Sequence, residues 1–187
     1  MKRKTAFIMA GVICLLALVL AGWYLGKWGQ GSATAVNPPG TGPTSAADQQ
    51  PPLPEQISGL PLTALVSGPE AVSDISRMHG KGIAVVEGYI ARYTGGDREI
   101  TLWVSVSASE AEAAALFRVM DAKMPASRVF TQRKVIKLDN KEVISVQGMG
   151  LSHFYWLQGK YNYWLATNDP ASTPSEALFS DLFSLPQ

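Results

Sequence analysis

Few residues in this chain could carry acid–base or metal chemistry. The two histidines are His79 and His153, and no H-x-x-x-H spacing is present to let one helix offer two imidazoles to a metal ion. No G-x-S-x-G turn exposes a serine nucleophile, although serines are plentiful and a Ser–His–Asp arrangement remains an alternative. The sequence therefore predicts no metal site and no cofactor. Catalysis, if present, would use Glu87 or His153.

Glu87 is the most unusual carboxylate of the chain. Alternation along an expected strand puts it in a row with Val85, Tyr89 and Ala91, which are largely apolar. A carboxylate inside such a row would have a raised pKa and could act as an acid or a ligand group. The alternative is that a bulge or the strand end lets Glu87 reach water. Glu87 is therefore a candidate site residue with two interpretations.

An aromatic hairpin supplies the other candidates. A turn at Gly159-Lys160 places aromatic side chains on both faces of its two strands. One face carries Phe154, Trp156, Tyr163 and Leu165, and the other carries His153, Tyr155, Leu157 and Trp164. Either both faces are covered, or one is an exposed platform of the kind that binds sugars, peptides or proteins. We therefore predict that His153, Tyr155 and Trp164 bind a ligand or partner.

Three helices and six strands must position these residues. Pro69 opens a short helix that ends at Gly80, a capping box at Ser109 and Glu112 opens a second, and Thr173-Pro174 opens a third. The expected strands are 83–93, 99–107, 129–138, 142–147, 153–158 and 161–167. Hairpins dominate this α-β-β-α-β-β-β-β-α order. The sequence predicts a single two-layer α+β domain, with a mostly antiparallel sheet of about six strands and flanking helices.

Short turns also predict which residues face each other across the hairpins. A turn at Asp139-Asn140 pairs Lys137 with Glu142, beside apolar pairs. A turn at Gly95-Gly96 pairs Arg92 with Glu99 in the same way. These registers fix the rows of side chains on each face of the sheet.

The N-terminus carries a membrane signal. The apolar run 5–25 is uncharged and long enough for a helix to cross a hydrocarbon core about 30 Å thick. Lys2, Arg3 and Lys4 precede it against only Lys27 after it, so the positive-inside bias puts the N-terminus in the cytoplasm. We expect residues 1–28 to be a signal anchor: one transmembrane helix, embedded in the bilayer through residues 5–25, that holds the rest of the chain outside the cell membrane.

The N-terminal segment also allows two kinds of processing. Ala33-Thr34-Ala35 resembles a signal peptidase site, so cleavage after Ala35 is an alternative, although it lies far beyond the apolar run. Cys14 sits in the middle of that run, and the residues before it do not form a lipidation motif. Because Cys14 is the only cysteine, the rest of the chain has no disulfide and no thiol nucleophile.

A linker and one domain follow the anchor. Residues 29–56 are rich in Pro, Gly and Ser and lack aromatic residues, so we expect a disordered, partly polyproline II tether. Residues 57–187 have the length of one extracytoplasmic domain. The formal net charge of the chain is +1 at pH 7, so it has no electrostatic footprint for nucleic acid.

Glycine and aromatic placement gives the chain a resemblance to a known group. At His79-Gly80-Lys81-Gly82, at 88–93, and from Gly148-Met149-Gly150 through 153–156, it resembles a family of uncharacterised bacterial membrane-anchored extracytoplasmic domains. The resemblance covers roughly residues 60–166 and implies no catalytic residues. A more distant likeness is to the two-layer α+β domains of the PsbP/Mog1 type, which implies an assembly or binding role.

Together these features predict a function without catalysis. We expect a membrane-tethered extracytoplasmic binding or assembly module of the bacterial cell envelope, whose partner is another envelope protein. A domain that binds a small ligand or carbohydrate is the first alternative. A hydrolase of envelope polymers that uses Glu87 or His153 is the second.

Overall fold

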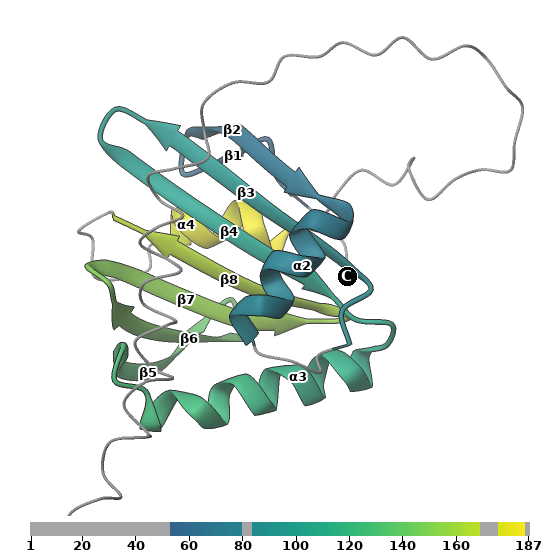
Figure 1. The fold of residues 1–187 in the computed structure, drawn as a ribbon. Coiled ribbons are helices and arrows are strands. Elements are labelled where there is room, and N and C mark those ends of the chain that lie inside the picture. The colour runs from purple at the N-terminus through teal and green to yellow at the C-terminus, as the bar shows by residue number, and fades with distance from the viewer. Residues whose placement is uncertain (1–52, 80–83, 169–175, 186–187) are drawn as a thin grey trace, which may run out of the picture. The chain divides into compact units, whose positions relative to one another are not determined.

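The computed structural model describes residues 53–79, 84–168 and 176–185 (Figure 1). These residues belong to one compact unit. The expected anchor at 1–28, the cleavage site and most of the expected linker lie outside the described residues. No helix within the described ranges is long and apolar enough to cross a membrane. The anchor and its orientation therefore stay predictions.

One antiparallel sheet forms the centre of the domain. Its strand order is β1-β2-β3-β4-β8-β7-β6-β5, and each neighbouring pair is antiparallel. The strands are β1 (Gln56–Ile57), β2 (Leu60–Ser67), β3 (Glu87–Gly95), β4 (Arg98–Val106), β5 (Phe130–Leu138), β6 (Lys141–Gly148), β7 (Leu151–Gln158) and β8 (Tyr161–Thr167). The expected α+β class with a mostly antiparallel sheet is confirmed, but the sheet is strongly curled and has eight strands rather than six.

The two strands that the prediction missed are β1 and β2. Pro61 near the start of β2 argues against a strand in the sequence. A bulge between Leu62 and Ala64 then shifts the register against β3 and interrupts the period-2 pattern. Both features remove the sequence pattern of a strand, although β2 pairs with β3 along most of its length in the structure.

Three helices form where the sequence predicts them, although the expected end at Gly80 and the expected start at Thr173-Pro174 lie outside the described residues. The helices are α2 (Gly68–His79), α3 (Glu110–Lys123) and α4 (Glu176–Phe183), with a short 3₁₀ turn η2 (Met124–Ala126) after α3. The Ser109 hydroxyl caps α3 by accepting a hydrogen bond from the Glu112 amide at 3.2 Å. Pro125 lies in η2, where the α-helix ends. The capping residue and the stop were both readable from the sequence.

The helices cover both faces of the sheet, which corrects the two-layer prediction. On one face, called here the α4 face, Phe179 of α4 packs on Phe154 and Trp156 in the main core. On the opposite α2/α3 face, Met120 of α3 packs with Tyr155, and α2 lies close over Gly88 of β3 (Figure 1). Because the β7–β8 hairpin is apolar on both sides, each side needs a covering layer.

The hairpin registers follow the predictions in part. The Asp139-Asn140 turn pairs Lys137 with Glu142 as predicted. The β3–β4 turn is instead Gly96-Asp97, so Arg92 faces Thr101 rather than Glu99. Arg92 still forms an ion pair with Glu99 at 3.3 Å, from a diagonal position. A slip of two residues keeps every side chain on its predicted face.

The last residues of the expected linker pack on the domain. Leu53 is buried in the main core. The carbonyl oxygen of Pro54 accepts a hydrogen bond from the Tyr93 hydroxyl at 3.0 Å. Residues 53–56 therefore lie against the sheet, ahead of the expected domain boundary at residue 57.

Candidate partner-binding surface

His153 lies on the α2/α3 face of β7 and is fully engaged by its neighbours. Its Nε2 donates to the carbonyl oxygen of Gly148 at 3.0 Å, and its Nδ1 accepts from the Trp164 indole at 3.1 Å. A carbonyl only accepts, so the ring is neutral with its proton on Nε2. Burial lowers the pKa of His153 from 6.5 to about 4, against the opposing effect of the Gly148 hydrogen bond. His153 is therefore a satisfied, buried histidine that holds Trp164 in place.

Tyr155 anchors α3 to the sheet. Its hydroxyl donates to Asp121 of α3 at 2.7 Å, and Arg133 of β5 contacts the same carboxylate through two hydrogen bonds of 2.8 Å. The Arg133 hydrogen bond lowers the pKa of Asp121, with a further contribution from Tyr155. Burial raises the pKa of Tyr155. Tyr155 is fully buried, so its ring does not reach the surface in this structure.

Trp164 differs from these two candidates because it is half-buried. Its ring stacks on Tyr155 at a centroid distance of 4.9 Å and meets the edge of Phe130 at 5.2 Å. Trp103 of β4 lies directly opposite Trp164 in the sheet and is also half-buried. Two indoles on adjacent strands thus reach the surface between α2 and α3.

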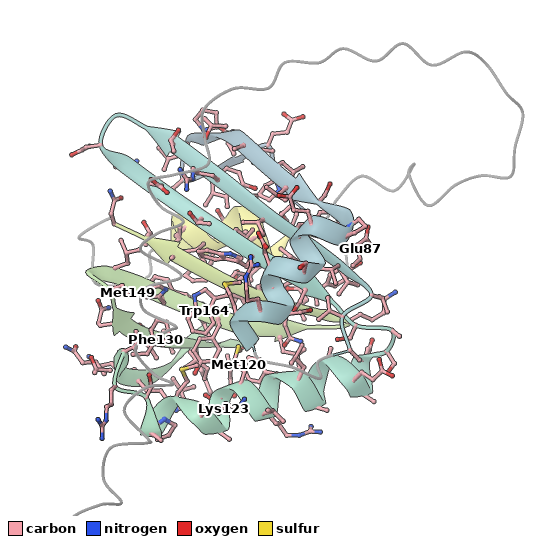
Figure 2. The ribbon with its side chains drawn as sticks, in the orientation of Figure 1. Glu87, Met120, Lys123, Phe130, Met149 and Trp164 are labelled. Carbon is pink, nitrogen blue, oxygen red and sulfur yellow. The ribbon has the colours of Figure 1, made fainter. Side chains whose placement is uncertain are left out.

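A strained turn extends this apolar surface. Met149 joins β6 to β7 with a φ of 54°, a left-handed conformation that methionine rarely adopts, and its side chain is 45% exposed. Phe130 packs over the neighbouring Gly148, where an added Cβ would lie 2.5 Å from the ring. Figure 2 shows Met149, Phe130 and Trp164 gathered at one end of the sheet, above α3. We call Trp103, Trp164, Phe130 and Met149 the aromatic strip.

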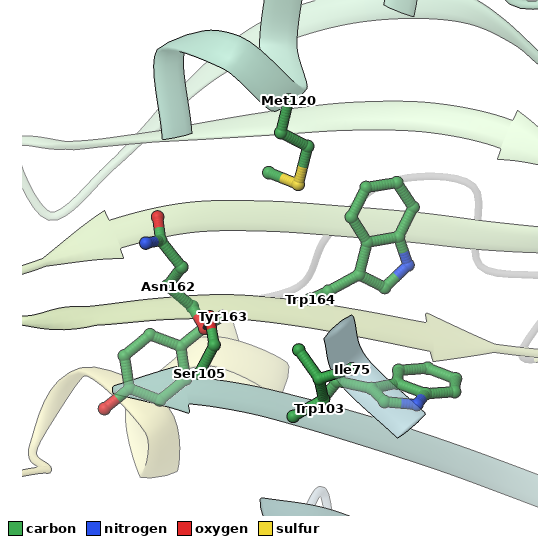
Figure 3. Close-up of a pocket in the computed structure, with 7 residues that line it drawn as sticks. All are labelled: Ile75, Trp103, Ser105, Met120, Asn162, Tyr163 and Trp164. Carbon is green, nitrogen blue, oxygen red and sulfur yellow. Dashed lines mark hydrogen bonds between the residues drawn. The ribbon is translucent and has the colours of Figure 1, made fainter. Parts of the chain in front are cut away.

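The hollow beside the strip is small. Figure 3 shows its lining between α2 and α3, with Ile75 and Met120 from the helices and Trp103 and Trp164 from the strands. Its volume is about 10 Å³, which is about enough for one water molecule. Typical small-molecule sites are roughly 300–1,000 Å³. The surface is therefore shaped for a shallow contact rather than for enclosing a ligand.

Glu87 lies apart from this surface. It is the first residue of β3, it is exposed, and it accepts a hydrogen bond from the Tyr89 hydroxyl. Tyr89 belongs to the core of the α4 face. Glu87 thus reaches water at the strand end, which was one of its two interpretations.

The structure also limits the catalytic alternatives. Glu87 and His153 lie on opposite faces of the sheet, so they cannot act together in one cleft. The side chain of His79 lies outside the described residues. No group of three or more His, Cys, Asp or Glu in the part of the chain that the structure describes could hold a metal ion.

Comparison with known proteins adds no relative. No protein-family model matches the chain, and no curated protein is significantly similar to it. The resemblance to bacterial extracytoplasmic domains therefore stays a prediction.

Of the four predicted site residues, Glu87 and Trp164 reach the surface at separate places, and His153 and Tyr155 are buried. Trp164 belongs to the aromatic strip, and Glu87 does not. Sequence reasoning missed Trp103, Phe130 and Met149 as members of this surface. One local signal could have indicated Met149. Short hairpin turns usually carry glycine, asparagine or aspartate, and Gly148-Met149-Gly150 places a large apolar residue there instead.

Proposed function

We propose that this chain is a membrane-tethered extracytoplasmic binding module of the bacterial cell envelope, without catalytic activity, and that its partner is another envelope protein. The aromatic strip is its contact surface. The observation that carries this proposal is the pairing of two half-buried indoles, Trp103 and Trp164, side by side between α2 and α3.

Three physical features support a protein partner. Tryptophan is the side chain most enriched among residues that dominate binding energy, because it offers a large rigid surface at low entropic cost. Methionine adds a soft, adaptable contact. Met149 also lies in the two-residue turn between β6 and β7, where its side chain is 45% exposed.

The predicted anchor would determine where in the cell envelope this surface meets its partner. A single transmembrane helix at 5–25 and a tether up to residue 52 would hold the domain near the outer face of the membrane. The domain would then meet partners in the same envelope layer without needing a high affinity of its own.

Carbohydrate binding is the second candidate. Indoles can stack on the apolar faces of sugar rings, and the half-buried Trp103 and Trp164 lie on neighbouring strands. The hollow, with room for about one water molecule, gives a sugar no enclosed site and therefore favours the protein partner.

The proposal is tested by capture from solubilised envelope with the full chain as bait. Met149→Lys places a charge on the strip, and Val119→Lys places one at a 54% exposed site on α3 as the matched control. We expect a discrete protein to bind the wild type and Val119→Lys and to be lost with Met149→Lys. Binding of purified cell-wall glycan with the same pattern would favour the carbohydrate candidate.

A folding control accompanies this experiment. Urea unfolding of both variants shows whether Met149→Lys retains the native fold, since a turn residue contributes few buried contacts. Equal capture by the wild type and both folded variants would contradict the proposed surface.

A further inference from the structure

The two edges of the sheet differ in how they are protected. At one end, β5 carries Arg133, Lys134 and Lys137. It also contains a bulge between Thr131 and Lys134, with Gln132 at a φ of 55°. Charged side chains and bulges are the usual devices that stop an edge strand from pairing with another molecule. These features of the β5 edge therefore disfavour pairing with a strand of another molecule.

The other end of the sheet is not protected in this way along its whole length. The short strand β1 covers only the start of β2, where it pairs with Leu60 and Pro61, and the Leu62 amide donates to the Glu55 carbonyl at 2.9 Å. From Ala64 to Ser67, β2 pairs with β3 on one side, and within the described residues no strand pairs with its other side. This part of the edge presents backbone groups to any incoming strand.

The exposed part of β2 is also uncharged and regular. No Lys, Arg, Asp or Glu occurs between Leu60 and Ser67. The bulge of β2 lies before Ala64, so the register from Ala64 to Ser67 is continuous. Leu65 is 40% exposed at the middle of this segment. The protective charges of β5 have no counterpart here.

The sequence of this edge is complementary to itself. If two copies pair antiparallel about a two-fold axis at Leu65, each Leu65 faces the other and Ala64 faces Val66. Both kinds of pair are apolar, which favours antiparallel pairing. No like charges oppose each other anywhere along the contact.

We propose that the β2 edge pairs with the β2 edge of a second copy of this chain to form a two-fold symmetric dimer. The two sheets join into one continuous sheet through backbone hydrogen bonds. The contact is only about three residues long in each copy, from Ala64 to Val66, which places it among weak interfaces below about 1,200 Å². The dimer forms at high protein concentration, and it leaves the aromatic strip of each copy accessible.

Disulfide trapping tests the predicted register. Paired Cα atoms in an antiparallel sheet lie about 4.5–5.5 Å apart, which is within the range of a disulfide. Leu65→Cys in the full chain, with Cys14→Ser to remove the only native thiol, is expected to form an intermolecular disulfide under mild oxidation. Val135→Cys, a 50% exposed site on β5, is the matched control and should form little. No disulfide at position 65, or an equal yield at position 135, would overturn the proposal.

Charge insertion tests the dimer without relying on a cysteine. Sedimentation equilibrium of the full chain in detergent, which its expected anchor requires, should show a concentration-dependent dimer for the wild type and for Val135→Lys, and a monomer for Leu65→Lys. Urea unfolding verifies that both variants fold. A wild type that stays monomeric at its highest soluble concentration refutes the proposal, as does a dimer that persists unchanged in Leu65→Lys. Neither substitution touches the aromatic strip, so failure here leaves the partner-binding test intact.

Discussion

Acid should weaken this fold through His153. The ring is 2% exposed, and its neutral form makes two hydrogen bonds, to Gly148 and from Trp164. Burial lowers its pKa in the folded state to about 4, whereas an unfolded chain would take up a proton near the ordinary value of 6.5. The free energy of unfolding therefore has its highest contribution from His153 above pH 6.5. This contribution is lost as the pH drops from 6.5 towards 4.

The magnitude follows from the two pKa values. A difference between 6.5 and about 4 corresponds to roughly 3 kcal/mol when the whole interval is crossed. Between pH 7.5 and pH 5, where most of the interval is covered, the loss amounts to about 2 kcal/mol. This is a large share of the total stability of a small domain, which is roughly 5–15 kcal/mol.

The assay compares the wild type with His153→Gln. Glutamine can donate to the Gly148 carbonyl and accept from the Trp164 indole, but it does not titrate. Urea unfolding followed by tryptophan fluorescence gives the free energy of unfolding of each chain at pH 7.5 and pH 5. Carboxylates such as Asp121 titrate in both chains, so their contribution cancels in the comparison.

The expected result is a steeper loss in the wild type. The wild type should lose about 2 kcal/mol more than His153→Gln between the two pH values. Equal losses in the two chains would refute the reasoning, because His153 would then titrate alike in the folded and unfolded states. An NMR titration midpoint for His153 near 6.5 in the folded chain would refute it as well.

Two further predictions concern the packing behind the aromatic strip. Tyr155→Phe removes the hydrogen bond to Asp121 and should lower the free energy of unfolding by about 1–2 kcal/mol, and by less in an Asp121→Asn background, as measured by a urea double-mutant cycle. The same loss in both backgrounds would show that the hydroxyl acts elsewhere. Gly148→Ala places a Cβ 2.5 Å from the Phe130 ring and should cost about 1–3 kcal/mol by urea unfolding, with partial recovery on adding Phe130→Leu. A neutral Gly148→Ala would contradict the close packing of Phe130.

The hairpins show what the sequence could predict. Asp139 and Asn140 both adopt positive φ, the conformation that a type I′ hairpin turn requires, so the β5–β6 register followed from the turn. The run Gly95-Gly96-Asp97 allows a two-residue turn at either of two positions, and the structure uses the later one. The β3–β4 register is shifted by two residues from the predicted one. Because this number is even, each side chain still lies on the face of the sheet that was predicted for it.

The composition of the surface could not be predicted in the same way. Tyr155 is buried because α3 reaches it through Asp121, and Trp103 lies beside Trp164 because β4 pairs with β8. Both contacts join segments that are distant in the sequence, and no local pattern indicates where a helix comes to rest on a sheet. The aromatic content of β7 and β8 indicated a surface but not which rings the helices would cover.

Site-specific photo-crosslinking in intact envelopes shows whether the aromatic strip contacts a partner protein. A photoreactive residue at Met149, in the aromatic strip, is compared with one at Val119, which is exposed on α3. We expect one discrete protein adduct from position 149, its loss when Trp103→Ser is added, and no such adduct from position 119. The same adducts from both positions, or an adduct from position 149 that persists in a folded Trp103→Ser chain, would contradict this expectation.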